Sequence, residues 1–352
     1  MKYKQKWMHV ALAILLFGSC TGCGDVESET GASETTEVEA ENEDLEVIRA
    51  AVPLNGTELT IESIAVAEYS GLLAEELAAV GYEVEVVGFG GGGTAVNEAL
   101  ASGEVDVAFM GDIPELIAVS NGIEIQAFAS LNQQGNLGIL VAADSGIETV
   151  EDLEGKTIVT SFGTVADKYL FDLLEEYDMS VDDVNRVNDI ANAGTLVSSG
   201  EADAIVSNTA GLYNWVSSGI GEVLITSDDD PDLACQYFAV GRTEYIEEHS
   251  DAIVAIVKAL LQVPDWCVEN TEEAYAAFAS DGVDAEIFQY VYPADTGFDY
   301  FEPEITVEAL EKLENLNQYL LDTELTSNAA DIDSFINTDF LEQAEEELGI
   351  TS

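Results

Sequence analysis

Basic residues are scarce in this chain, and their scarcity limits what the chain can bind. The sequence has 10 Lys and Arg residues against 70 Asp and Glu residues. Three of the ten are Lys2, Lys4 and Lys6, and residues 1–22 contain no acid, so the remainder carries 7 basic and 70 acidic residues, a net charge of −63. Nucleic acid and anionic lipid surfaces attract positive charge and are excluded as partners. Such an acid excess is typical of a solvated surface in a high-salt or other screening medium.

Histidine and cysteine are also nearly absent. Beyond residue 23 the sequence has one histidine, His249, and two cysteines, Cys235 and Cys267. A zinc site needs about four grouped ligands, so we expect no metal and no cofactor. The two cysteines either form a disulfide outside the cytoplasm or stay as buried thiols, and their spacing does not decide between these alternatives.

The sequence also lacks a long apolar run. The run from Val10 to Phe17 is far shorter than the roughly 20 residues of a membrane-spanning helix. It follows the N-terminal lysines and ends on Gly18 and Ser19, a pattern that predicts a secretory signal peptide over residues 1–22.

Two cysteines follow the apolar run, each directly after a small residue. This arrangement resembles the lipobox at which a bacterial signal peptide is cut and the new N-terminal cysteine is acylated. Cys23 is the preferred lipidation site, and Cys20 is the alternative. A further interpretation is ordinary cleavage of the signal peptide, in which the two cysteines have no role. Residues 23–46 are rich in Glu, Ser, Thr and Gly, which predicts a disordered acidic tether.

From residue 47 onward, short apolar runs alternate with helical patterns, which predicts an α/β protein with parallel-rich sheets covered on both faces. About 305 residues are too many for one core, so we expect two lobes. The expected division is a first part of lobe 1 over 47–131, lobe 2 over 132–232, and a return to lobe 1 with C-terminal helices over 233–352. The expected strands are 47–54, 83–89, 105–110, 123–129, 137–142, 157–161, 184–187, 202–207, 223–226 and 235–241, and the main expected helices are 63–79, 94–102, 113–120, 164–177, 251–263 and 307–321.

The predicted cleft between the lobes is the natural ligand site, at the carboxyl ends of the strands. The chain would cross between the lobes near 131–137 and 232–241. A short repeat relates Ala101-Ser-Gly-Glu-Val-Asp-Val-Ala to Ser199-Gly-Glu-Ala-Asp-Ala-Ile, and in both units the glycine is expected to end a helix in the left-handed conformation.

Three loops between a strand and a helix are candidates for ligand contact. They are Phe89-Gly-Gly-Gly-Gly-Thr94, Met110-Gly-Asp-Ile-Pro114 and Thr160-Ser-Phe-Gly-Thr164. Glycine lets the backbone approach a ligand, and free N–H groups at a helix start can hold an anion without Lys or Arg. Each loop also has a purely structural explanation, as a flexible connection or a helix cap. Arg242 is expected to pair with a nearby acid such as Glu244.

These loops, in their order and spacing, resemble the substrate-binding proteins of ABC importers for aliphatic sulfonates, taurine and nitrate. The resemblance covers about residues 47–260. Its most specific pieces are Glu98-Ala-Leu-Ala-Ser-Gly-Glu-Val-Asp-Val with Gly111-Asp-Ile-Pro114, Thr149-Val-Glu-Asp-Leu-Glu-Gly-Lys156 with Gly163-Thr164, and Gly200-Glu-Ala-Asp-Ala204.

The resemblance implies a two-lobed, type II periplasmic-binding-protein-like fold with two interlobe crossings. It implies a solute-binding component that is anchored outside the cytoplasm by its lipid and delivers a sulfonate, taurine, nitrate or related anion to an ABC permease and ATPase. We expect a monomer. The implied ligand contacts are Asn55, Gly92, Gly93, Thr94, Gly111, Asp112, Ser161, Phe162, Gly163, Thr164 and Asn208.

One departure from the resemblance concerns the wall of the cleft. The sulfonate branch tends to have Trp-Asp-Pro where this chain has Asn208-Thr209-Ala210, and the Cys-rich motif of the pyrimidine-precursor binders is absent. The alternatives are a surface sensor or adhesin on the same fold, a pyrimidine-precursor binder, or an enzyme. We expect no enzyme, because His249 belongs to no recognisable catalytic motif.

Overall fold

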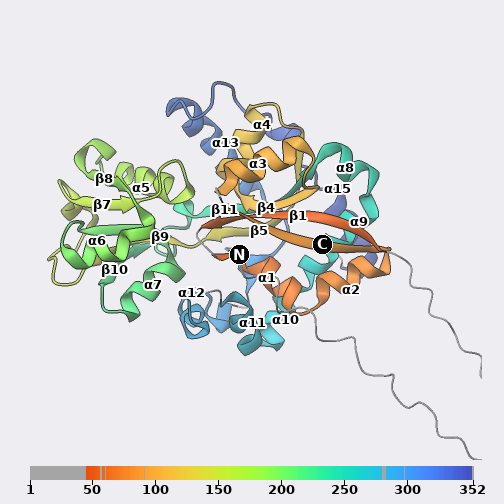
Figure 1. Ribbon diagram of the computed structural model, residues 1–352, viewed down its shortest axis with the longest axis horizontal. Helices are drawn as coiled ribbons and strands as arrows, with labels where there is room; N and C mark the ends of the chain where they lie inside the picture. The colour runs from red at the N-terminus through yellow and green to blue at the C-terminus, as the bar shows by residue number, and fades with distance from the viewer. Residues whose placement is uncertain are drawn as a thin grey trace, which may run out of the picture. The chain divides into compact units, whose positions relative to one another are not determined.

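The computed structural model describes residues 45–55, 58–59, 61–90, 92–279, 283–296 and 298–350. The predicted signal peptide, Cys20 and Cys23, and nearly all of the predicted tether lie outside these residues. Residues 43–352 form one compact unit. Two mixed, parallel-rich sheets organise this unit, as the sequence predicted (Figure 1).

Sheet 1 is built from the first five strands and one late strand. Its order is β2-β1-β4-β11-β5, with β3 also paired to β1. β3 and β4 run parallel to β1, whereas β11 is antiparallel to both β4 and β5. The strands are β1 (Glu46–Asn55), β2 (Glu58–Leu59), β3 (Tyr82–Gly90), β4 (Val107–Gly111), β5 (Ile125–Gly135) and β11 (Cys235–Arg242).

Sheet 2 contains the intervening strands in the order β10-β6-β9-β7-β8. β7 runs parallel to β8 and β9, and β6 is antiparallel to its two neighbours. The chain passes from sheet 1 to sheet 2 between Gly135 and Leu137, and it returns between Thr226 and Cys235. The strands are β6 (Leu137–Ala142), β7 (Thr157–Thr160), β8 (Asn185–Asn188), β9 (Ala204–Asn208) and β10 (Gly221–Thr226).

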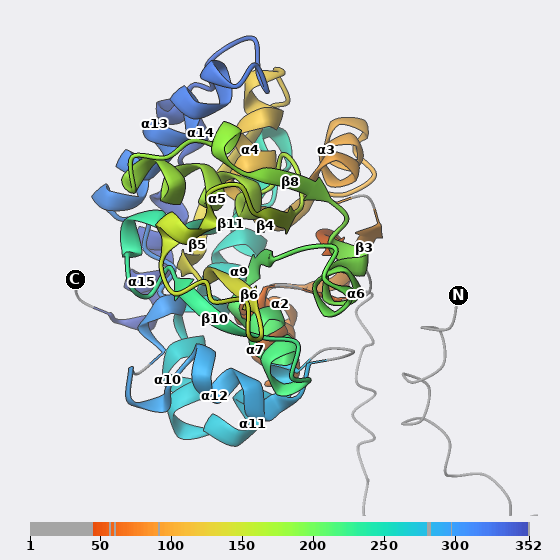
Figure 2. The ribbon, with the colours of Figure 1, turned by 90° about the vertical axis from the view of Figure 1, so that its left-hand side faces the viewer.

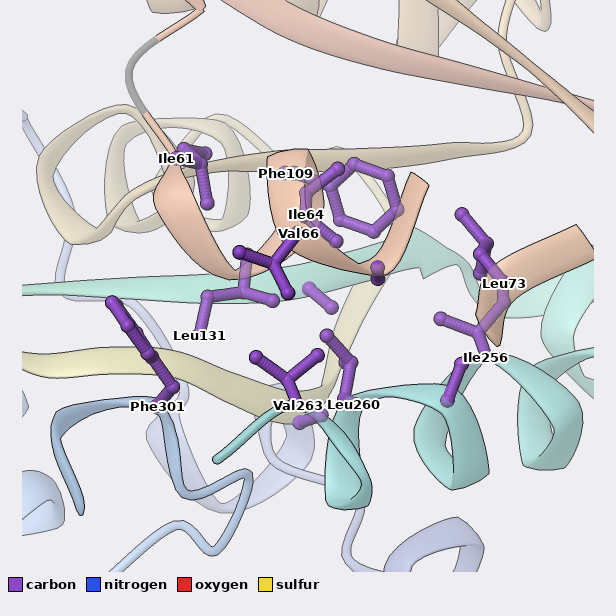
Figure 3. Packing of buried hydrophobic residues seen from close by; sticks show 14 of the residues in the cluster. Ile61, Ile64, Val66, Leu73, Phe109, Leu131, Ile256, Leu260, Val263 and Phe301 are labelled. Atoms are coloured by element: carbon purple, nitrogen blue, oxygen red, sulfur yellow. The ribbon is translucent and has the colours of Figure 1, made fainter. Parts of the chain in front are cut away.

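Helices cover both faces of each sheet, because the central strands bury apolar side chains on both sides; all five residues of β4 are buried. One face of sheet 1 packs on the helices Leu72–Ala79 and Ser250–Leu261 and on their neighbours. Figure 3 shows Phe109, Leu131 and Ile256 among the buried residues of this core. We call sheet 1 with its helices lobe 1, and sheet 2 with its helices lobe 2. The helices before the return are α1 (Glu62–Tyr69), α2 (Leu72–Ala79), α3 (Gly92–Ser102), α4 (Asp112–Ser120), α5 (Val165–Glu176), α6 (Ala193–Ser199) and α7 (Thr209–Ser217).

The C-terminal third is helical, as expected, and it packs mainly on lobe 1. Two of its helices also reach lobe 2. Tyr319 of α13 lies edge-on to Phe171 of α5 at 5.8 Å, and Tyr290 of α12 lies 5.8 Å from Tyr213 of α7. These helices are α8 (Thr243–Glu248), α9 (Ser250–Leu261), α10 (Val263–Glu269), α11 (Thr271–Phe278), α12 (Phe288–Val291), α13 (Val307–Asp322), α14 (Ile332–Phe335) and α15 (Asp339–Leu348).

The single helix expected over 63–79 is in fact two helices. Gly71 separates α1 from α2 and has φ +84°. This left-handed conformation is one that glycine adopts readily, and it turns the chain between the helices. The apolar pattern continues through the break because both helices pack on the same core.

Candidate ligand-binding site

The two lobes meet where β4 leads into α4 and β7 leads toward α5. A methyl group added at Gly111 would lie 3.6 Å from Val165 Cγ1 and 3.7 Å from a ring carbon of Tyr237. Gly111 ends a lobe 1 strand, Val165 begins a lobe 2 helix, and Tyr237 lies on the returning strand. The structure therefore brings the second and third candidate loops together across the interlobe boundary.

The Gly-rich loop leads from β3 into α3. Gly92 has φ +65°, and a Cβ at Gly93 would overlap the ring of Pro114 in α4. Gly93 is therefore explained by the close packing of α3 on α4, which is a structural reason for this glycine. Thr94 is exposed. The backbone of Asn55 pairs with Glu58 in a β1–β2 hairpin, and its side chain lies outside what the structure describes.

Asp112 is buried at the start of α4. Its carboxylate accepts hydrogen bonds from the backbone N–H of Ile113 at 2.8 Å and of Gln236 at 3.3 Å. Burial raises its pKa to about 6, although Lys168 and these N–H groups act in the opposite direction. Glu115, one turn later, is completely buried, and burial together with Asp112 raises its pKa well above the ordinary value.

The loop from Ser161 to Thr164 makes several hydrogen bonds of its own. The N–H of Phe162 donates to Asn188 Oδ1 at 3.2 Å, and the N–H of Gly163 donates to Asp167 Oδ2 at 3.1 Å. The Thr164 hydroxyl donates to the carbonyl of Ser161 at 2.6 Å. A ligand that used these two N–H groups would have to replace Asn188 and Asp167 as acceptors.

Arg186 stabilises this loop, although no sequence motif had indicated a role for it. Its guanidinium lies 4.7 Å from the Phe162 ring centre and 4.6 Å from that of Phe171, and it pairs with Asp167 at 2.7 Å. Phe162 remains 44% exposed, so its ring covers the guanidinium at the protein surface. Such stacking of Arg between aromatic rings holds the start of α5 in place.

A cavity of about 660 Å³ lies beside these loops, between α5 and α13. Figure 2, which faces the lobe 2 side, shows α4, α5 and α13 close together. Asp112 and Val165 line the cavity, and so do Lys168 and Lys312. The chain beyond residue 22 has only four lysines, so half of them line this cavity. Asp172, which pairs with Lys168, and further acids also contribute to the wall.

A smaller pocket of about 20 Å³ lies between α1 and α7. Its lining includes Glu62 from lobe 1 and Asn208 and Thr209 from lobe 2. Asn208 is the N-cap of α7 and accepts a hydrogen bond from Gly211 N–H at 2.8 Å. Burial raises the pKa of Glu62 to about 7, although a hydrogen bond with Tyr292 acts in the opposite direction. No local motif pointed to Glu62, because it is one of 70 acids.

The remaining reactive side chains are two buried cysteines, of which Cys235 lines the large cavity, and His249, which lies beside Glu46. Cys235 and Cys267 are free and buried, so they do not form a disulfide, and burial raises the pKa of each thiol. His249 is 3.0 Å from the Tyr82 hydroxyl and stacks on Tyr245. It also lies 3.7 Å from Glu46, at the amino end of β1, whereas the candidate loops follow the carboxyl ends of strands.

Arg242 pairs with an acid, as expected, but the acid is Asp106 at 3.3 Å. Of the aromatic residues that could line the cleft, Phe89 and Trp215 are partly buried against the cores of lobe 1 and lobe 2. Among the described residues, no group of three or more His, Cys, Asp and Glu side chains could hold a metal ion. None of the described helices combines the length and apolar character needed to span a bilayer.

Comparison with known proteins assigns the family. The NMT1/THI5-like family matches residues 63–274, which is more than half of the chain. The chain belongs to the NMT1/THI5-like family. The match runs from α1 to α11 and so includes the three candidate loops, both crossings and all of sheet 2.

Curated relatives of this family member include binding proteins and enzymes. The chain is 25% identical over 222 residues to a Bacillus subtilis (strain 168) protein named for binding aliphatic sulfonates, covering 62% of this chain and 66% of the relative. It is 26% identical over 179 residues to a 4-amino-5-hydroxymethyl-2-methylpyrimidine phosphate synthase of Schizosaccharomyces pombe, covering 47% and 51%. The alignments thus span between about half and two thirds of these relatives' own length.

Solved structures show the same fold. The crystal structure of a Methylobacillus flagellatus KT protein that is named as a periplasmic sulfonate-binding protein of an ABC transporter matches with a TM-score of 0.78 at 24% identity. The match covers 88% of this chain and 97% of that chain. The two-lobed periplasmic-binding-protein fold predicted from the sequence is therefore confirmed.

Proposed function

We propose that this protein is the extracytoplasmic solute-binding component of an ABC importer, which captures a small solute between its lobes and delivers it to a membrane permease and its ATPase. The observation that carries this proposal is the cavity of about 660 Å³ at the junction of α4, α5 and α13. Its volume lies in the range of small-molecule sites, and residues of both lobes line it. A solute held there would favour the closed arrangement of the lobes.

The proposed solute carries an anionic group, as sulfonates, taurine and nitrate do. Lys168 and Lys312 supply ammonium groups in a chain that has few, and the start of α5 supplies the positive end of a helix dipole. The proposed contacts near this end are Gly111, Asp112 and the loop from Ser161 to Thr164. Acids outnumber lysines in the wall, so binding depends on local donors and not on the net charge of the cavity.

The proposed location follows from the N-terminal pattern and from the named relatives. Cleavage before Cys23, or alternatively Cys20, would leave an acylated cysteine, and residues 23–46 would tether the folded unit to the membrane. Mass spectrometry of the mature N-terminus tests this. We expect a lipid-modified cysteine at one of these two positions, and an unmodified N-terminus elsewhere would refute the anchor.

Binding without catalysis is the role that the reactive groups favour. The raised pKa of both cysteines disfavours the thiolate that a nucleophile needs, and His249 lies at the opposite end of sheet 1 from the candidate loops. The synthase among the relatives makes an enzyme the second candidate. A titration panel should therefore include 4-amino-5-hydroxymethyl-2-methylpyrimidine beside the anions.

Two glycines offer a matched test of the site. Gly163 and Gly155 have φ +70° and +73°, and a Cβ at either would meet no atom within 4 Å. Gly163→Val and Gly155→Val therefore impose similar backbone strain, but only Gly163 lies in a candidate loop. In calorimetric titrations with alkanesulfonates, taurine, nitrate and the pyrimidine, we expect Gly163→Val to weaken binding by about tenfold or more, and Gly155→Val to leave it unchanged.

The outcomes separate the proposals. Equal affinity in both variants would place the solute away from the loop at Ser161–Thr164. Preference for the pyrimidine or for a cation would overturn the anionic class while leaving solute binding intact. Turnover of any compound in the panel would move the protein to the enzyme class.

A further inference from the structure

Arg186 lies on β8, the end strand of sheet 2, and its guanidinium contacts two aromatic rings and a carboxylate. The ring of Phe162 belongs to the loop at Ser161–Thr164, whereas the ring of Phe171 belongs to α5. Nη1 of Arg186 also donates to the Asp167 carboxylate at 2.7 Å. A planar guanidinium can stack on rings and pair with a carboxylate at the same time, whereas the ammonium group of lysine is a compact point charge. Arg186 therefore connects the loop to the helix that follows it.

The backbone of the loop is held by the same part of lobe 2. Asn188, two residues after Arg186 on β8, accepts a hydrogen bond from the Phe162 N–H at 3.2 Å. Asp167, the ion-pair partner of Arg186, accepts one from the Gly163 N–H at 3.1 Å. Asp167 is 5% exposed, and a carboxylate at such a position is costly without a positive partner. The acceptor that holds Gly163 thus depends on Arg186.

The second ring of this arrangement also meets lobe 1. Phe171 lies edge-on to Tyr319 of α13, with 5.8 Å between the ring centres. Lys168, on the same helix as Phe171, lies 5.4 Å from the centre of the Tyr319 ring. Burial raises the pKa of Tyr319 to about 12; Asp167 acts in the same direction and Arg186 opposes it. The charges that hold the loop in lobe 2 therefore act on a side chain of lobe 1.

The contacts form a continuous series from the loop to lobe 1, which runs through Phe162, Arg186, Phe171 and Tyr319. Opening of the lobes would separate Tyr319 from Phe171. The Phe171 ring would then lose a neighbour, and the guanidinium that stacks on this ring would be held less firmly. Coupling between two such equilibria is reciprocal, so a group that orders the loop also favours the closed lobes.

We infer that Arg186 is a positioning residue that couples the order of the Ser161–Thr164 loop to the closing of the lobes, through Phe171 and Tyr319. Phe171 and Tyr319 are among the described residues that line the 660 Å³ cavity and Arg186 is not, so Arg186 acts through the loop and not by contact with a solute. The inference rests on the proposed function in taking this loop as part of the solute site. The coupling itself exists without a solute, and an ordered loop lowers the cost of binding one.

Hydrogen–deuterium exchange of the purified protein, with no solute added, tests the role of Arg186. The peptide that spans the loop reports the Phe162 and Gly163 amides, and a peptide from α9 reports the stability of lobe 1. Arg186→Lys keeps a positive charge beside Asp167 but removes the planar stacking group. We expect exchange in the loop to become about 2- to 30-fold faster, as the loss of a partly buried cation–aromatic contact predicts, with no change in α9.

Two further variants test the connection to lobe 1. Tyr319→Ala changes only lobe 1, yet exchange in the loop of lobe 2 should become about 2- to 10-fold faster. Tyr213→Ala is the matched control, because it removes the other interlobe aromatic contact, also at 5.8 Å, which joins α7 to α12. Its loop exchange should stay close to that of wild type. In the double variant Arg186→Lys/Tyr319→Ala, exchange should be no faster than in Arg186→Lys alone, because the series is already broken.

Four results would overturn the inference. Wild-type exchange in Arg186→Lys would show that a positive charge beside Asp167 is sufficient and that stacking positions nothing. An unchanged loop in Tyr319→Ala would confine Arg186 to a role within lobe 2. Equal acceleration in Tyr213→Ala and Tyr319→Ala, or acceleration that extends to α9, would indicate general opening or unfolding in place of the proposed series of contacts. Solute binding itself is tested separately, by the titrations of the glycine variants.

Discussion

At the scale of single residues, two carboxyl groups between the lobes, Glu62 and Asp112, have a pKa near neutrality. Glu62 has a pKa of about 7 and Asp112 of about 6, and burial is the main cause for both. Burial disfavours the charged form of an acid, so the fold loses stability as the pH rises from the group's ordinary pKa to its raised pKa in the folded chain. In a chain with 70 acids, these two stand out by their environment and not by their sequence context.

Glu62 predicts a defined change of stability with pH. Below its ordinary pKa of about 4.5 the carboxyl is protonated in the folded and unfolded chain and has no effect. Between about 4.5 and 7 the unfolded chain ionises first, so the folded state loses stability as pH rises, by at most about 3 kcal/mol. Glu62→Gln should therefore be more stable than wild type at about pH 8 and equally stable at about pH 4.

Urea unfolding at both pH values measures this difference. Glu75→Gln is the control, because it removes one exposed acid and changes the net charge by the same amount. If both variants gain equal stability at high pH, the gain reflects general charge repulsion and the special environment of Glu62 is refuted.

At the scale of elements, the two lobes use the same short unit to join a helix to a buried strand. Gly103 and Gly200 both adopt the left-handed conformation that the repeat predicted, with φ +71° and +77°. Three residues later, Asp106 accepts a hydrogen bond from the backbone of Arg49 and Asp203 accepts one from the backbone of Thr157. Each aspartate thus ties the start of its strand to the neighbouring parallel strand.

The two aspartates should differ in their contribution to stability. Asp106 also accepts from the Arg49 side chain at 2.7 and 2.9 Å and pairs with Arg242. Burial alone would raise its pKa, but the hydrogen bonds from Arg49 outweigh burial and lower it. We expect Asp106→Ala to cost about 2 to 4 kcal/mol and Asp203→Ala about 1 to 2 kcal/mol, measured by chemical denaturation.

Asp182→Ala provides the control for this comparison, since Asp182 is an exposed acid in lobe 2. It should change the free energy of unfolding by less than about 0.5 kcal/mol. Equal losses for Asp106→Ala and Asp203→Ala would mean that the arginine contacts contribute nothing beyond the shared backbone bond.

At the scale of the whole folded unit, two aromatic contacts among the described residues join the lobes. Tyr213 of α7 meets Tyr290 of α12, and Phe171 of α5 meets Tyr319 of α13. Opening of the lobes about the crossings near 131–137 and 232–241 would separate both pairs. In the proposed closing motion, these contacts would stabilise the closed state and favour binding of a solute between the lobes.

Tyr213→Ala should weaken solute binding by about 2- to 10-fold, because an aromatic pair contributes about 0.5 to 1.5 kcal/mol. Tyr69→Ala is the matched control, since Tyr69 forms an edge contact with Trp266 within lobe 1. Calorimetry gives the affinities, and small-angle scattering should show contraction of the wild-type particle on binding. Affinity reduced equally in both variants, or binding without contraction, would contradict a closing motion.

The alternation of apolar runs and helical patterns was enough to predict the α/β class, the strands and most helices. The reason is that the spacing of apolar residues along the sequence differs between a buried strand and a helix. The glycine caps at 103 and 200 followed from local conformational preference. The sequence pattern did not predict the break at Gly71. Both helices pack on one core, so the apolar pattern continues across the turn between them.

The candidate site depended on contacts between distant residues. The sequence marked the loops that meet at Gly111 and Val165, but Lys168 and Lys312 are 144 positions apart and come together only when α5 packs near α13. The hydrogen bonds that occupy the Ser161–Thr164 loop, and the burial that raises the pKa of Glu62, likewise arise from packing. Local structure was determined by short-range periodicity and conformational preference. The environment of each charged side chain was decided by tertiary structure, because burial and the distances between charges are set only when the chain folds.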